Sequence, residues 1–260
     1  MFGWKKKRRK RLRGRPLPRA WREILLRNVP YFFRLSEEDR RELEGHIHVF
    51  LAEKEFEGCG LEISDEIRVT IAAQACVLLL HRETDYYPGL RTILVYPHPY
   101  VVKGVQRDEA GILSEGEQVR LGESWQHGAV VLAWDAVKKG AADPSDGQNV
   151  VFHEFAHQLD GESGATEGAP LLEHHSRYAP WARILGREYA RLIKDLEEHR
   201  QTFLAAYGAV SPAEFFAVVT EAFFEQPAAL CSRHPELYGQ LSQFYRQDPA
   251  AASVPGGRPS

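Results

Sequence analysis

The 260-residue sequence has no apolar run close to the roughly 20 residues that a membrane-spanning helix needs. Its basic start is not followed by an apolar segment of signal-peptide length, so we expect no secretory signal. The sequence has only three cysteines, which is too few for a disulfide framework, and their wide spacing does not suit a cysteine-rich zinc site. We therefore expect reduced thiols and a cytoplasmic protein. These cysteines are Cys59, Cys76 and Cys231.

Acidic residues are absent from residues 1–22, which carry a charge of +11, while the remainder of the chain carries −14. A run of like charge is typical of a solvated tail, and we expect residues 1–22 to be disordered. Binding of this tail to nucleic acid or to another anionic surface stays open as an alternative. No zinc-finger, homeodomain or RNA-binding signature accompanies the run.

The rest of the sequence, with 43% hydrophobic and 27% charged residues overall, has the composition of a globular domain. We expect one domain over residues 23–248 and a disordered tail over residues 249–260, which are rich in Gly, Pro and Ser. Two strands followed by mainly helical segments predict an α+β fold. Periodicity predicts helices after Ser36 and over 66–81 and 181–207. The capping residues Asn149 and Ser211 predict helices over 150–160 and 211–225. Strands are expected over 91–102, ending near Pro97, and over 128–137.

Residues 149–161, NVVFHEFAHQLDG, contain the pattern with the clearest chemical meaning. His153 and His157 are four residues apart, so on a helix both imidazoles project from one face and can bind one zinc ion. Glu154 is rotated about 100° from His153 and can act on a water molecule beside the metal. The alternative is a buried helix whose two histidines are satisfied by hydrogen bonds in the core.

A catalytic zinc ion also needs a third protein ligand. The metzincin extension of the motif requires glycine at position 160 and histidine at position 163, and Asp160 and Ser163 exclude it. His174 and His175 have suitable chemistry, but we expect them in a surface loop.

The segment SPAEFFAVVTEAFFE offers three glutamates in the 211–225 helix, namely Glu214, Glu221 and Glu225. Glu214 is also the third residue of a capping box that begins at Ser211, so the residues leave a cap and a metal ligand as equal alternatives. Asp160 and Glu221 are candidates for holding the N–H of a ligand histidine. The alternatives are hydrogen bonding at the helix end for Asp160 and a solvent-facing charge for Glu221.

HEFAHQLD, followed about 55 residues later by AYGAVSPAEFFAVVTEAFFEQP, resembles the Mlc titration factor A family of bacterial zinc metallopeptidases. GAVVLAWDAV is similar to the stretch before the motif in that family, and the resemblance runs from about residue 20 to 245. The catalytic core is also similar to the peptidase domain of anthrax lethal factor. The resemblance implies a zincin-like, gluzincin-type fold that is mainly helical with a small mixed sheet.

The same resemblance implies one Zn²⁺ per chain, with Glu214 joining His153 and His157 as ligands and Glu154 as general base. It places Tyr207 near the metal as a catalytic residue, and the alternative is a tyrosine that only packs. The implied activity is hydrolysis of peptide bonds, of aminopeptidase type on short peptides. The implied partner is a transcriptional repressor of the Mlc type that regulates sugar uptake, and the alternative is a non-catalytic protein that sequesters this regulator. The strand over 128–137 is either an edge strand that pairs with substrate or an ordinary core strand.

Overall fold

The structure, a computed structural model, describes residues 2–107, 113–120, 122–125 and 128–252. It is mostly helical with a small sheet, which confirms the predicted α+β class. The α-helices are α1 (Phe2–Arg13), α2 (Arg19–Asn28), α3 (Glu37–Glu53), α4 (Asp65–Val77), α5 (Trp134–Ala142), α6 (Val150–Asp160), α7 (Tyr178–Glu197), α8 (Pro212–Glu225), α9 (Pro227–Arg233), α10 (Pro235–Tyr245) and α11 (Pro249–Ala252). Short 3₁₀ helices are η1 (Pro30–Arg34), η2 (Gly161–Ser163), η3 (His175–Arg177) and η4 (Ala206–Ala209).

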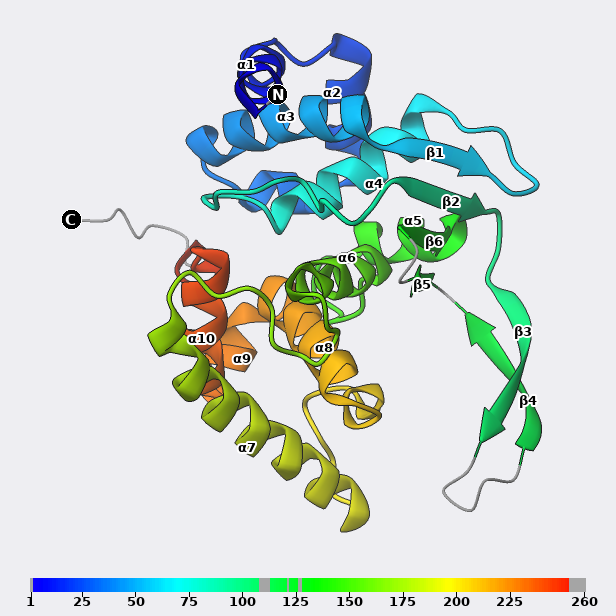
Figure 1. The fold of residues 1–260 in the computed structure, drawn as a ribbon, viewed down its shortest axis with the longest axis vertical. Coiled ribbons are helices and arrows are strands. Elements are labelled where there is room, and N and C mark those ends of the chain that lie inside the picture. Colours follow the sequence, from blue (N-terminus) through cyan, green and yellow to red (C-terminus); the bar gives the residue numbers. More distant parts are fainter. Residues whose placement is uncertain (1, 108–112, 121, 126–127, 253–260) are drawn as a thin grey trace.

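Six strands form one four-stranded sheet and one separate hairpin in the described part of the chain. The sheet has the order β1-β2-β6-β5, in which β1, β2 and β6 are parallel and β5 is antiparallel to β6. Figure 1 shows α1, α2 and α3 at one end of the molecule, α6 and α8 side by side at its centre with α10 beside α9, and α7 reaching the other end. The strands are β1 (Glu55–Gly58), β2 (Thr92–Tyr96), β3 (Tyr100–Arg107), β4 (Leu113–Arg120), β5 (Gly122–Trp125) and β6 (Ala129–Ala133).

The strand predicted over residues 128–137 is shorter in the structure and does not lie at an edge. β6 ends at Ala133, and α5 begins at Trp134 with Asp135 in its first turn, where a negative charge suits the helix dipole. β6 lies between β2 and β5, so among the described strands β5 holds that edge of the sheet. The prediction that residues 128–137 pair with substrate as an edge strand is therefore wrong, because both sides of β6 already pair within the sheet.

Serine side chains cap the starts of α3 and α4, and the sequence predicts the first of these caps. Ser36 Oγ accepts the N–H of Asp39 at 3.1 Å, which begins α3, and Ser64 caps α4 in the same way. The predicted helix over 181–207 is α7, which ends earlier, at Glu197. The chain turns there through His199, whose φ is 54°, in the left-handed region that ends helices. This turn separates Tyr207 from α7 and places it in η4.

The basic segment is not a disordered tail: residues 2–13 form α1, which packs against α3. Leu12 is buried, and Arg9 donates to both oxygens of Glu53 at 2.9 and 2.7 Å and also bonds Asp85. The prediction of disorder failed because it counted like charges and did not find their acidic partners on α3 and after α4. Of the predicted C-terminal tail, Pro249–Ala252 is helical, and residues 253–260 lie outside the described residues.

Replacing Arg9 with methionine is expected to lower the free energy of unfolding by about 1–3 kcal/mol, because the half-buried carboxylate of Glu53 would lose the charged donor of its two hydrogen bonds. Burial alone would raise the pKa of Glu53, but the hydrogen bonds and charge of Arg9 hold that pKa below its ordinary value of 4.5. The pair therefore stabilises the fold above pH 4.5 and loses this effect as pH falls through the lowered pKa of Glu53. Urea denaturation at pH 7 and pH 3 measures both effects. The control is Lys10→Met on the exposed side of α1, and an equal loss of stability in this control would contradict the account.

No helix among the described residues combines the length and the apolar character that crossing a lipid bilayer requires.

Candidate metal centre

The helix that carries the motif, α6, is fixed at its start by Asn149, as predicted. Asn149 Oδ1 accepts the N–H groups of Val151 and Phe152, both at 3.1 Å. The amide of Asn149 also donates to Gln74 Oε1 at 2.9 Å, which ties α6 to α4. The flanking apolar side chains of α6 are buried, whereas His153 and His157 retain 14% and 10% exposure of their side chains. The histidines therefore occupy the one stripe of α6 that a ligand can reach.

His153 and His157 face the same carboxylate. Their ring centroids are 5.0 Å apart, one helical turn along α6. Glu214 Oε2, from α8, lies 2.9 Å from His153 Nε2 and 3.3 Å from His157 Nε2. The two imidazoles and this carboxylate form a group whose ligand atoms all lie within 4.8 Å of one another.

Capping of α8 and ligation by Glu214 are not exclusive roles. Ser211 Oγ accepts the backbone N–H of Glu214 at 3.2 Å, so Ser211 caps α8. The carboxylate of Glu214 points to the histidines of α6, against which α8 packs. The first turn of α8 thus presents its acidic side chain to the motif helix while its own backbone is satisfied.

This donor set fits a tetrahedral zinc ion. Bonds of about 2.0–2.1 Å to zinc place neighbouring ligand atoms roughly 3.3–3.4 Å apart. The separations of 2.9 and 3.3 Å from Glu214 Oε2 to the two imidazole nitrogens are close to that edge length. Two imidazoles and one carboxylate also match the donor types of catalytic zinc sites that leave a fourth position open.

Glu221 lies about two turns beyond Glu214 on α8. It contacts Nδ1 of His153, the ring nitrogen that does not face Glu214. Its Oε1 is 2.8 Å from His153 Nδ1, and its Oε2 accepts the N–H of Asn149 at 2.5 Å. Burial would lower the pKa of His153, but the carboxylates of Glu214 and Glu221 raise it to about 10. Glu221 therefore orients this ring and links it to the start of α6, so the solvent-facing alternative for Glu221 is wrong.

Asp160 does not bond a histidine within the described part of the chain. Its Oδ2 accepts the N–H of Gly168 at 2.7 Å, while its Oδ1 and His157 Nδ1 are buried without a hydrogen-bond partner among the described residues. Burial raises the pKa of Asp160, and the N–H groups of Gly168 and Ala169 oppose that effect. The prediction that Asp160 holds the N–H of a ligand histidine is therefore wrong in this structure, because its Oδ2 bonds the following loop and its Oδ1 has no partner among the described residues.

That loop passes very close to the start of α8. Gly168 has a φ of 74°, and a Cβ there would lie 2.4 Å from the carbonyl oxygen of Pro212. Its own carbonyl accepts the indole N–H of Trp181 at 3.0 Å. Asp160 and Trp181 thus fix the loop against the turn that carries Glu214, a contact that motif spacing does not reveal.

Glu154 and Tyr207 both lie beside the donor set, in different environments. Glu154 is 5% exposed, and its Oε2 has no hydrogen-bond partner among the described residues. Burial raises the pKa of Glu154 to about 7, while the two motif histidines oppose the rise. Tyr207 is 53% exposed, with its ring centroid 5.8 Å from that of His153. Substrate can reach this position, and the catalytic role of Tyr207 stays a prediction beside the alternative of a tyrosine that only packs.

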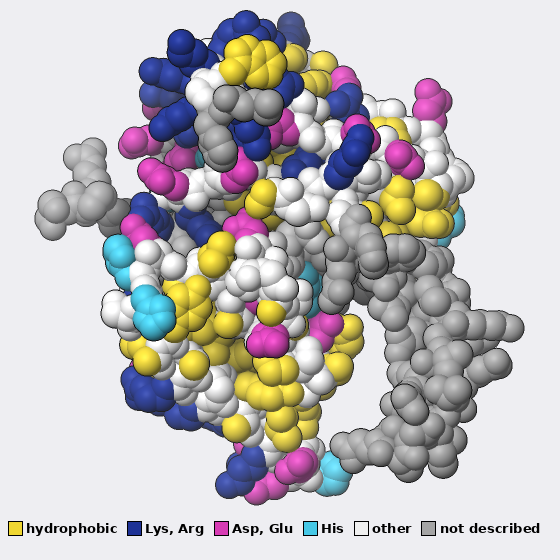
Figure 2. Space-filling model, in the orientation of Figure 1, with side chains coloured by type: hydrophobic (Ala, Val, Ile, Leu, Met, Phe, Trp, Pro, Cys, Tyr) yellow, Lys and Arg dark blue, Asp and Glu magenta, His cyan; other side chains and the backbone are white. Residues whose placement is uncertain are grey.

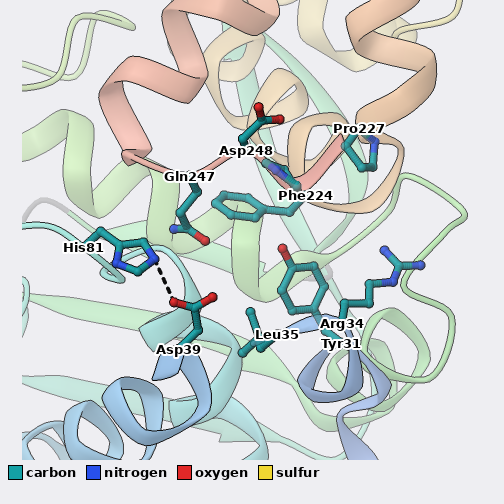
Figure 3. Close-up of a pocket in the computed structure, with 10 residues that line it drawn as sticks. Tyr31, Arg34, Leu35, Asp39, His81, Phe224, Pro227, Gln247 and Asp248 are labelled. Carbon is teal, nitrogen blue, oxygen red and sulfur yellow. Dashed lines mark ion pairs between the residues drawn. The ribbon is translucent and has the colours of Figure 1, made fainter. Parts of the chain in front are cut away.

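The remaining histidine candidates do not join the centre. His174 and His175 flank the start of η3 and belong to no potential metal-binding group among the described residues. The second such group is Asp39, Glu42 and His81, in which His81 Nε2 lies 2.9 Å from Asp39 Oδ1. Figure 3 shows this ion pair beside a cavity of about 80 Å³ between η1, α3 and the chain after α10.

The Asp39–Glu42–His81 group is an ion-pair network that joins α3 to the turn after α4. His81 Nδ1 lies 3.3 Å from Glu42 Oε2, so each nitrogen of this ring already faces a carboxylate. The Arg13 guanidinium lies 3.8 Å from Glu42 and opposes the binding of a further cation.

Glu221→Gln is expected to lower zinc affinity about 10–100-fold, because an amide cannot accept from both His153 and Asn149 as the carboxylate does. The matched control is Glu225→Gln, which removes another buried carboxylate of α8 that bonds no histidine among the described residues. Competition with a chromogenic chelator measures both affinities. Equal losses in the two variants would contradict the role given to Glu221.

Comparison with known proteins covers almost the whole chain. Residues 4–246 match the family described as glucose-regulated metallopeptidase M90. An uncharacterised protein of Synechocystis is 42% identical over 95% of this chain and 90% of that protein. Mlc titration factor A of Klebsiella pneumoniae is 32% identical over 89% of this chain and 87% of that protein. The Escherichia coli protein of the same name is 31% identical over 88% of this chain and 86% of that protein.

Proposed function

The chain belongs to the glucose-regulated metallopeptidase M90 family, and from that premise we propose that it hydrolyses peptide bonds with one zinc ion per chain bound by His153, His157 and Glu214. The single observation that carries this assignment is the position of Glu214 Oε2, within 3.3 Å of a nitrogen of both imidazoles. A zincin-like fold is part of the proposal, supported by α6 packing between the sheet and α8. We propose that residues 23–248 form the metallopeptidase domain, and that α1, which precedes this range, packs on the domain through α3.

The protein residues divide the chemistry between them. A bound Zn²⁺ supplies Lewis-acid chemistry, polarising the scissile carbonyl and lowering the pKa of water to about 7. The Glu154 carboxylate takes the proton of the attacking water and delivers it to the leaving amine. Its burial suits this task, because a pKa of about 7 lets the carboxyl group exchange a proton near neutral pH.

Tyr207 and Glu221 complete the arrangement. The Tyr207 hydroxyl donates a hydrogen bond to the oxyanion that develops on the substrate carbonyl, from an exposed position next to His153. Glu221 holds His153 Nδ1 and so leaves Nε2 on the side of Glu214, where it would bind the metal. The three free thiols support a cytoplasmic location for this reaction.

The substrates we propose are short peptides with a free amino terminus, on the strength of the family resemblance. The test is a peptide panel in which each sequence is present with a free and with an acetylated amino terminus. The zinc-loaded protein is expected to release the first residue from the free peptides, and chelation should abolish the reaction. Internal cleavage of acetylated peptides at the same rate would contradict the aminopeptidase assignment. Hydrolysis that survives full removal of metal would contradict the metallopeptidase mechanism itself.

A second function is favoured by the relatives named Mlc titration factor A. We propose that the chain also binds a repressor of the Mlc type and thereby acts on the regulation of sugar uptake. Gel filtration of the protein with such a repressor tests this, and the complex should form equally well with the Glu154→Gln variant. Absence of a complex would remove the second function. A complex together with an inactive, zinc-free wild type would favour the purely sequestering alternative.

A further inference from the structure

The helix α1 has an outer face that the packing of the domain does not use. Its side chains are exposed, and Trp4 is the most exposed large hydrophobic residue of the described chain, at 74%. None of its four cations has an ion-pair partner among the described residues. Figure 2 shows Lys and Arg side chains gathered over this end of the molecule. We name as the α1 outer face Trp4, Lys6, Lys7, Lys10 and Arg11.

The other side of α1 fixes the helix to the body. Arg8 donates to the carbonyl of Ala52 at 3.1 Å, Arg9 bonds Glu53 and Asp85, and Lys5 bonds Asp85 at 3.0 Å. Leu12 is buried between these residues and the body. The helix is therefore held in one orientation, with the α1 outer face turned to solvent.

The composition of the α1 outer face selects among anionic partners. Three of its four cations are lysines, which act as point charges and suit a diffuse layer of headgroups, whereas Arg8 and Arg9 contact the protein itself. Tryptophan is enriched where membranes meet water. The sequence of α1, FGWKKKRRKRLR, has no Asn, Gln, Ser or Thr, so nucleic acid would find only its cations as hydrogen-bond donors. We propose that the α1 outer face binds the surface of bilayers containing anionic phospholipid, with Trp4 entering the headgroup layer.

The docked surface is remote from the proposed metal centre. Helix α1 packs on α3, α3 on α4, and α4 on α6, so two helices lie between the α1 outer face and the motif helix. Figure 1 places α1 at one end of the molecule and α8 beyond α6. Binding at this face therefore leaves the histidines accessible to peptides, and substitutions in it are expected to leave peptide hydrolysis unchanged.

The experiment is co-sedimentation of the full chain with vesicles of phosphatidylcholine, alone or mixed with phosphatidylglycerol. We expect binding only to the mixed vesicles, and its loss in about 1 M salt, where the Debye length is about 3 Å. Changing the four cations of the α1 outer face to glutamine should weaken binding about fivefold per charge, or roughly two to three orders of magnitude in all. The matched control removes four exposed cations of α5 and α7 and should bind as the wild type does. The control positions are Lys139, Arg183, Arg191 and Lys194.

Brominated lipid reports on Trp4. It should quench part of the fluorescence of the wild type, and this part should be missing in Trp4→Phe. Circular dichroism and peptide hydrolysis verify that each variant is folded. The proposal is overturned if the folded protein fails to bind the mixed vesicles at low salt, or if the four-glutamine variant binds like the control. It is also overturned if duplex DNA or RNA competes the protein off the vesicles and binds more tightly through the same face.

Discussion

Glu154→Gln is expected to lower the rate of peptide hydrolysis by about 10²–10⁴-fold while each chain keeps its zinc ion, since this is the usual contribution of a general base. The amide has the shape of the carboxylate but cannot take a proton from water. Glu154 is no part of the donor set formed by His153, His157 and Glu214, so metal binding should persist. Steady-state kinetics on one peptide and elemental analysis of the same sample measure both quantities.

The loss of activity should not come from unfolding. In the metal-free protein, burial raises the pKa of Glu154 from 4.5 to about 7, so ionisation of this group favours the unfolded chain increasingly between those two pH values. Glutamine carries no such charge, and the variant should unfold at no lower urea concentration than the wild type at pH 8. Glu162→Gln, just beyond α6, serves as the control and should keep full activity. A wild-type rate in Glu154→Gln would contradict its role as base, and a zinc-free variant would move Glu154 into the donor set.

The second large effect is expected from Glu214→Gln, which should lower zinc affinity by more than about 100-fold, beyond the range typical of residues that only orient a ligand. Glutamine preserves the backbone N–H that Ser211 caps, so α8 should stay intact. What is lost is the anionic oxygen that lies 2.9 and 3.3 Å from the two imidazole nitrogens. Peptide hydrolysis should fall with the zinc content and recover in part at high zinc concentration.

The control for Glu214→Gln lies on the same helix. Glu225 is 2% exposed, and burial raises its pKa to about 8, so glutamine resembles the protonated form that it holds at neutral pH. Glu225→Gln should therefore bind zinc as the wild type does. Zinc affinity that is unchanged in Glu214→Gln, or reduced equally in Glu225→Gln, would show that the third ligand is elsewhere.

Local signals in the sequence were sufficient to predict α6 and α8, the two helices of the proposed metal centre. Asn149 and Ser211 each cap the helix that they were predicted to cap, and the four-residue spacing of the histidines places both rings on one face. Capping and periodicity depend on neighbours within one turn, so they can be read without the fold. The role of Glu214 could not be decided in this way, because its carboxylate had a possible partner both within its own turn and across the domain.

The predictions that failed depended on contacts between distant segments. Residues 1–22 read as a solvated tail because Glu53 and Asp85, the partners of Arg9, lie far along the sequence. Asp160 stands on the expected side of α6, but its carboxylate bonds Gly168 in a loop whose path the motif does not determine. The place of β6 inside the sheet likewise depends on its pairing with β5. Each of these features depends on tertiary contacts, which no periodic pattern in the sequence indicates.

The most direct test of the metal assignment is anomalous diffraction at the zinc edge from crystals of the zinc-loaded protein. We predict one peak per chain, about 2.0–2.2 Å from an imidazole nitrogen of His153 and of His157 and from an oxygen of Glu214. No peak between α6 and α8, or a peak at Asp39, Glu42 and His81 in its place, would contradict the account.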